Sequence, residues 1–82
     1  MTDEADWRSV AVEAYRAGWS ALERWKHHPD TTVQFVLEDL KEALLDLKQA
    51  TIADDEPGMW LHVDEVQMLL IELADLAGGS HA

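Results

Sequence analysis

Four histidines are the side chains of this sequence best suited to hold a metal ion: His27, His28, His62 and His81. His27 and His28 are adjacent where the first predicted helix ends, so their rings diverge, and no His-x-x-x-His pair occurs within a predicted helix. His81 follows two glycines, and His62 lies towards the other pole of a three-helix bundle. His27 and His28 are better explained as complements to the negative end of the first helix dipole. We therefore expect neither a metal site nor a cofactor.

Two pairs of acidic residues have a spacing that suits divalent cations, in "DLKE" (39–42) and "ELAD" (72–75). These four acids resemble the Glu-x-x-Glu and Glu-x-x-Asp motifs that hold Mg²⁺ in the MazG-type all-α nucleotide pyrophosphohydrolases. However, Asp39 stands where that family has glutamate, both pairs fall on faces predicted to meet solvent, and three helices are predicted where that fold has four. The sequence also lacks cysteine and any serine or lysine with an implied histidine partner. We expect a protein that is not an enzyme.

The net charge of the chain is strongly negative, at −11 from 17 acidic and 6 basic residues. Such a charge repels nucleic-acid phosphates and anionic membrane surfaces, so we expect no direct binding to nucleic acid or membrane. The negative charge is unevenly distributed along the chain, because residues 54–82 hold seven acids and no lysine or arginine. No apolar run approaches the roughly 20 residues of a membrane span. The N-terminal residues lack a signal-peptide pattern, and cysteine is absent, which predicts a cytoplasmic protein.

Two proline-containing breaks interrupt the helical pattern of the sequence. The run "HHPD" ends at Asp30, and Asp30 and Thr31 are both candidates to cap the next helix. Thr31 followed three residues later by Gln34 predicts a capping box. The second break, "DDEPG" (54–58), places Pro57 where it suits the first turn of a helix.

Between these breaks the apolar residues recur with the period of a helix, and no segment alternates as a strand would. The pattern therefore predicts an all-α three-helix bundle running up-down-up. We expect a single α-helical domain over residues 1–82, with residues 78–82 as a flexible tail. The predicted helices span residues of about 3–27, 32–53 and 57–77.

The apolar faces of the predicted helices differ in width on a helical wheel. The face of the second helix covers roughly 140°, whereas those of the first and third cover roughly 220° and 200°. In a closed three-helix bundle each helix contacts two neighbours, and a face somewhat wider than 100° suffices. The surplus on the first and third helices predicts a second interface, with another protein or with a copy of the same chain. Alternatively, the four tryptophans only fill a core that is otherwise rich in alanine.

The wheels predict a core and a set of partner-binding residues, but they give arcs and not neighbours, so the division between the two sets stays open. Gly18 lies among small residues of the first helix, and it either lets another helix approach closely or is merely tolerated. The predicted core consists of Trp7, Leu22, Trp25, Val36, Leu40, Leu44, Leu47, Val63, Val66, Leu70 and Leu73. The predicted partner-binding residues are Trp19, Leu45, Ile52, Trp60, Glu65, Ile71, Glu72 and Asp75.

Acidic residues also share faces of the second and third predicted helices, where like charges three or four residues apart are destabilising. Such faces either keep the domain soluble or meet a basic protein partner. We interpret the chain as a non-catalytic, acidic protein–protein interaction module, an inhibitor or an adaptor. It would bind its partner, for example a nucleic-acid-binding protein, through an apolar patch beside an acidic surface. The alternative is a homo-oligomeric helical structural unit, such as a homodimer.

Overall fold

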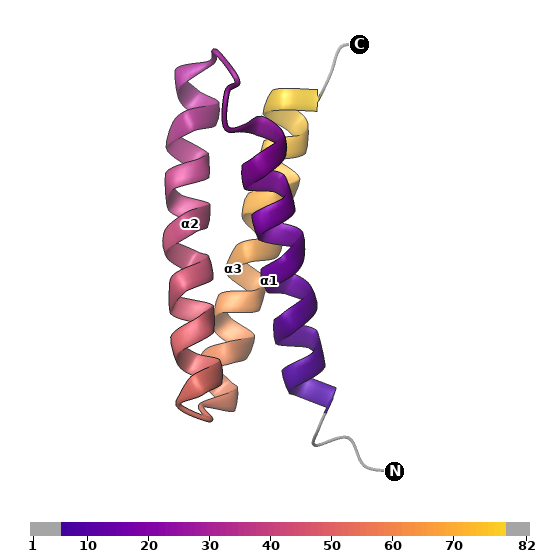
Figure 1. Ribbon diagram of the computed structural model, residues 1–82, viewed down its shortest axis with the longest axis vertical. Helices are drawn as coiled ribbons and strands as arrows, with labels where there is room; N and C mark the ends of the chain where they lie inside the picture. The colour runs from indigo at the N-terminus through magenta and orange to yellow at the C-terminus, as the bar shows by residue number, and fades with distance from the viewer. Residues whose placement is uncertain (1–5, 79–82) are drawn as a thin grey trace.

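The computed structural model describes residues 6–78, which form three helices that pack side by side (Figure 1). The helices are α1 (Asp6–Trp25), α2 (Thr31–Ile52) and α3 (Glu56–Leu73), and α3 continues into one π-helical turn, η1 (Ala74–Gly78). α1 and α3 run in the same direction and α2 is antiparallel to both, which confirms the predicted all-α bundle running up-down-up (Figure 1). The bundle is elongated, with principal extents of 44 × 22 × 17 Å.

The ends of the helices differ from the predicted ends by a few residues. α2 and α3 each begin one residue earlier than predicted, and α3 leaves α-helical geometry after Leu73. α1 ends at Trp25, two residues before the predicted end. Gly78 closes η1 instead of starting a tail. Residues 3–5 of the predicted first helix and 79–82 of the predicted tail lie outside the described residues.

Asp30 is the N-cap of α2, and its side chain accepts a hydrogen bond from the backbone N–H of Thr32 at 2.9 Å. The predicted capping box of Thr31 and Gln34 is therefore wrong. The side-chain amide of Gln34 instead donates to backbone carbonyls of the α1–α2 turn, including that of His28 at 2.8 Å. Because the last carbonyls of a helix have no partner within it, this side chain ties the first turn of α2 to the end of α1.

The turn between α2 and α3 is a Schellman motif. The N–H of Asp55 donates to the carbonyl of Ala50 at 2.9 Å, and the N–H of Asp54 donates to that of Thr51 at 3.2 Å. Asp54 has a φ of 61°, in the left-handed region that such turns usually fill with glycine. Asp55 then caps α3 by accepting a hydrogen bond from the N–H of Gly58 at 3.1 Å, and the proline of this break lies in the first turn, as predicted.

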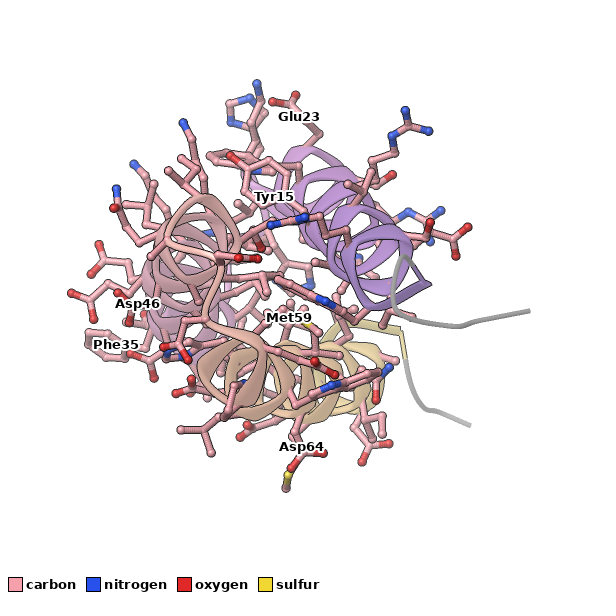
Figure 2. All side chains as sticks on the ribbon, turned by 90° about the horizontal axis from the view of Figure 1, so that it is seen from below. Tyr15, Glu23, Phe35, Asp46, Met59 and Asp64 are labelled. Carbon is pink, nitrogen blue, oxygen red and sulfur yellow. The ribbon has the colours of Figure 1, made fainter. Side chains whose placement is uncertain are left out.

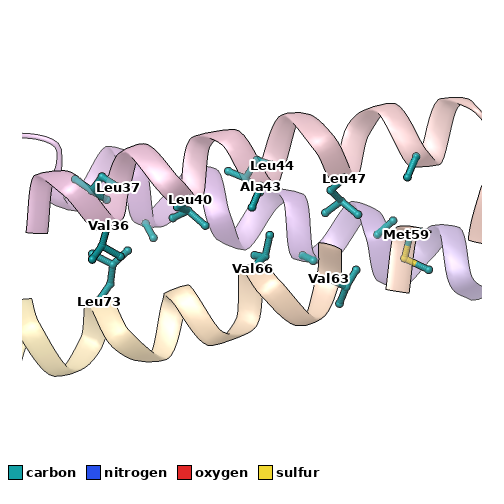
Figure 3. Packing of buried hydrophobic residues seen from close by; sticks show 14 of the residues in the cluster. Val36, Leu37, Leu40, Ala43, Leu44, Leu47, Met59, Val63, Val66 and Leu73 are labelled. Atoms are coloured by element: carbon teal, nitrogen blue, oxygen red, sulfur yellow. The ribbon is translucent and has the colours of Figure 1, made fainter. Parts of the chain in front are cut away.

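The core lies along the axis between the three helices, with Val36 of α2 pointing towards Leu73 of α3 near one end (Figure 3). Near the other end Met59 fills the space between the helices (Figure 2). The predicted core is largely confirmed, but Leu22, Trp25 and Leu70 are only partly buried at its margin. The largest fully buried side chains are Leu40, Leu44, Leu47, Met59, Leu73, Val33 and Val66.

Candidate interaction surfaces

The outward face of α3 carries large apolar side chains that the bundle does not cover. Leu61 is 66% exposed, Met68 63% and Ile71 67%, and Trp60 and Leu76 are also exposed. The inward face of the same helix is apolar too, because Met59, Val63, Val66 and Leu73 are buried in the core. A helix that is apolar on both faces normally has a partner on each. The outward face of α3 therefore exposes an apolar patch that the other described helices do not cover.

Acidic side chains surround these apolar residues. Asp64, Glu65, Glu72 and Asp75 are exposed along α3 and η1, and neither element contains lysine or arginine. Asp64 points away from the bundle (Figure 2). Among the described residues, the nearest approach to a countercharge on α3 is the ring of His62, whose Nδ1 lies 3.2 Å from Oε1 of Glu65. This surface therefore combines an apolar patch with an almost uncompensated negative charge.

A second surface lies between α1 and α2, where an open groove of about 310 Å³ is lined almost entirely by apolar atoms. Tyr15 stands at its wall and packs edge to face on Trp19, with ring centroids 6.1 Å apart. An edge-to-face arrangement is favourable for aromatic pairs, so Tyr15 packs on Trp19 while it lines the groove. The groove is lined by Ala11, Val12, Tyr15, Leu47, Lys48, Thr51 and Ile52.

The exposed side of α2 that borders this groove alternates between basic and apolar residues. Lys41, Leu45, Lys48 and Ile52 follow one another at intervals of four, three and four residues and are all exposed. Helical positions at such intervals form one stripe. Neither lysine makes an ion pair within residues 6–78, in contrast to Arg8, which pairs with Asp54. This stripe therefore carries two lysines in a strongly acidic chain, with the exposed Glu38 three residues before Lys41.

The other exposed side of α2 is acidic, as its sequence pattern predicts. Phe35 and Asp46 both point away from the bundle there (Figure 2). Asp39 and Glu42 are exposed as well, so the carboxylates of "DLKE" meet solvent. α2 therefore carries its two exposed lysines on the side next to α1 and Asp39 and Asp46 on the other side.

The predicted partner-binding residues do not form one patch. Trp60, Glu65, Ile71, Glu72 and Asp75 lie together on the outward face of α3 and η1. Three others belong to the side formed by α1 and α2, where Trp19 is half-buried and Leu45 and Ile52 are exposed.

No family model, curated protein or solved structure matches this chain. These surfaces also include Lys41, Lys48, Leu61 and Met68, which were not among the predicted binding residues. Their spacing of seven from other exposed residues was the signal that could have identified them.

The histidines and acidic residues of the described chain form no metal-binding cluster. No group of three histidine, cysteine, aspartate or glutamate side chains within 6–78 is arranged to hold a metal ion. His28 uses its Nδ1 to accept a hydrogen bond from the backbone N–H of Asp30 at 3.1 Å, so it acts in the α1–α2 turn. His81 lies outside the described residues. Among the described helices, none has the length and apolarity needed to cross a bilayer.

Proposed function

We propose that this protein is a non-catalytic protein–protein interaction module whose outward α3 face docks a basic partner protein. The observation that carries the proposal is the exposure of Leu61, Met68 and Ile71 on a helix whose other face already forms the core. Burying one such side chain at an interface contributes about 1.5–3 kcal/mol by the area it removes from water. Three of them are enough to anchor a partner if its shape is complementary.

The charge of this face selects the kind of partner. Asp64, Glu65, Glu72 and Asp75 would repel an acidic surface and attract a basic one, which raises the association rate and disfavours wrong partners. A nucleic-acid-binding protein presents a basic surface of this kind, so an inhibitor or adaptor acting on one is consistent with the proposal. We place the protein in the cytoplasm, which the absence of cysteine supports.

A designed peptide tests this proposal without a known partner. The probe is an amphipathic helical peptide with leucine and lysine at heptad spacing, and its matched control has glutamate in place of each lysine. We expect the lysine peptide to bind and the glutamate peptide to bind at least about tenfold more weakly, measured by titration calorimetry. Equal affinity for the two peptides, or no binding of either, would contradict the proposal.

Two charge-reversed variants locate the binding surface. E65K/E72K should weaken binding of the lysine peptide at least about tenfold, because it places like charges across the interface. D39K/D46K makes the same change in net charge on the acidic side of α2, with the same spacing of seven residues. It should lower the affinity far less, since that side lies away from the α3 face. Equal losses in both variants would mean that only net charge matters.

A further inference from the structure

Two exposed stripes of the bundle have complementary sequences at identical spacing. The basic stripe of α2 consists of Lys41, Leu45, Lys48 and Ile52. The acidic stripe of α3 consists of Leu61, Glu65, Met68 and Glu72, and it follows the same intervals of four, three and four residues. Lysines in the first stripe correspond to glutamates in the second, and apolar residues correspond to apolar residues, when the two helices run antiparallel.

We infer that the partner of the α3 face is a second copy of this chain, which docks its α2 basic stripe antiparallel on the acidic stripe. The inference rests on the proposed function and names its partner. The contact would pair Lys41 with Glu72 and Lys48 with Glu65 at its charged layers. It would place Met68 against Leu45 and Leu61 against Ile52 at its apolar layers. At 1.5 Å rise per residue these layers repeat at the same interval on both helices, so all four meet at once.

The groove beside the basic stripe supplies a place for one apolar side chain. Ile52 and Lys48 form part of its wall, opposite Val12 and Tyr15 of α1. A Leu61 side chain that packs on Ile52 therefore also reaches the groove, which adds contacts to one end of the interface. The apolar lining of this groove and the exposure of Leu61 are both accounted for by the same contact.

Other pairings between copies are less favourable. Two acidic stripes would bring glutamates together, and two basic stripes would bring lysines together, and like charges across an interface are unfavourable. A parallel arrangement of the basic stripe on α3 requires Leu69 and Leu76 in place of Met68 and Leu61. Leu69 already packs partly against the core of its own chain, so it is less free to take part. The antiparallel pairing uses the more exposed residues.

The geometry makes this contact heterologous. Within one chain the two stripes cannot meet, because α2 and α3 pack through their buried faces and both stripes point outwards. Each copy therefore keeps one unoccupied basic stripe or one unoccupied acidic stripe after it has docked. Such head-to-tail contacts produce rings or open chains, not a closed two-fold dimer. Since α2 and α3 are antiparallel in the bundle, successive copies would point in the same direction (Figure 1).

Sedimentation over micromolar to submillimolar concentrations tests the inference on the whole chain. The unmodified protein should form species larger than a dimer as concentration rises. K41E/K48E and E65K/E72K should each be monomeric, because each abolishes one stripe, and the control D39K/D46K should associate like the unmodified chain. The control matters because E65K/E72K and D39K/D46K both bring the net charge from −11 to −7. If only the general repulsion between chains mattered, both variants would associate to the same extent. That result would overturn the inference.

Mixing the two monomeric variants gives a sharper result. K41E/K48E retains an intact acidic stripe, and E65K/E72K retains an intact basic stripe. Together they can form one native contact and no more, so the mixture should contain a 1:1 complex that does not grow. Combining all four substitutions in one chain should restore association, because both stripes are reversed together. A mixture that stays monomeric, or that grows beyond two chains, would contradict the heterologous contact.

Disulfide cross-linking tests the direction of the helices, and the chain has no cysteine of its own to interfere. I52C mixed with L61C should form a mixed disulfide under mild oxidation if the stripes are antiparallel. I52C mixed with L76C is the matched control for the parallel arrangement and should not. Preferential cross-linking of the control pair would overturn the inferred register.

Self-association and binding of the lysine peptide, measured together, distinguish this inference from the proposed function. If the unmodified chain stays monomeric at every concentration but still binds the lysine peptide through its α3 face, the second copy is not the partner and the proposed function stands. If neither association nor peptide binding is seen, both are wrong. K41E/K48E should lose self-association while it keeps its affinity for the lysine peptide, since its acidic stripe is unchanged.

Discussion

Leu44 of α2 lies directly over Gly18 of α1. A Cβ placed on residue 18 would come within 2.5 Å of Cδ2 and 2.9 Å of Cδ1 of Leu44. Leu44 is fully buried, so its side chain has no solvent to move into. Leu44 therefore occupies the space that a Cβ on residue 18 would need, so the packing of α2 on α1 favours glycine at this position.

Gly18→Ala should destabilise the protein. Overpacking against Leu44 costs about 1–3 kcal/mol, and the better helix propensity of alanine returns about 1 kcal/mol. We expect a net loss of about 1 kcal/mol in the free energy of unfolding, measured by urea denaturation. Ser20→Ala is the control in an exposed position of the same helix and should be neutral or slightly stabilising. In a Leu44→Ala background the substitution should cost less, because the clash is gone; an equal cost would refute the explanation.

Met59 and Met68 provide a matched pair for the distinction between core and surface. Met59 is fully buried between the helices, and its replacement by alanine should cost about 2–5 kcal/mol in unfolding free energy. Met68 is mostly exposed on α3, and the same replacement should change stability by less than about 0.5 kcal/mol. Met68→Ala should instead weaken binding through the α3 face. A large loss of stability in Met68→Ala would show that this side chain belongs to the core.

The N-cap of α2 can be tested on two neighbouring residues. Asp30→Ala should lower the free energy of unfolding by about 0.5–2 kcal/mol, because the backbone N–H of Thr32 loses its acceptor. Thr31→Ala should have little effect, since its side chain does not cap the helix. Thermal denaturation monitored by circular dichroism compares the two variants. The opposite ranking would restore the capping role first predicted for Thr31.

Asp54→Gly should stabilise the turn between α2 and α3. Asp54 occupies the left-handed region, where a side chain costs up to about 1–2 kcal/mol and glycine costs less. The substitution also removes the exposed ion pair with Arg8, which contributes roughly 0–1 kcal/mol. We expect a small net gain in melting temperature. Arg8→Ala removes the ion pair alone and should cause a slight loss, so a large loss in Arg8→Ala would show that the pair matters more than the backbone.

Local physical rules were enough to predict the helices of this protein and most of its core. Pro29 and Pro57 interrupt the helical period wherever they fall, and a helix must bury its apolar stripe whatever it packs against. For that reason residues such as Leu40 and Leu47, at the centre of their stripe, were placed correctly. The excess of apolar side chains on α3 could also be predicted from the sequence, because it depends only on the width of the apolar arc on the helical wheel.

Only the tertiary structure decided which surplus residues share a surface. A helical wheel gives directions around one axis but not the neighbour that lies in each direction, so Leu45 and Ile52 could not be separated in advance from Trp60 and Ile71. The packing of α1 against one side of α2 made Ile52 part of the wall of a groove and left Leu45 exposed on the same stripe of α2. The packing of α3 on the core left the second pair facing outwards, because residues on opposite faces of a helix cannot both be buried by one neighbour.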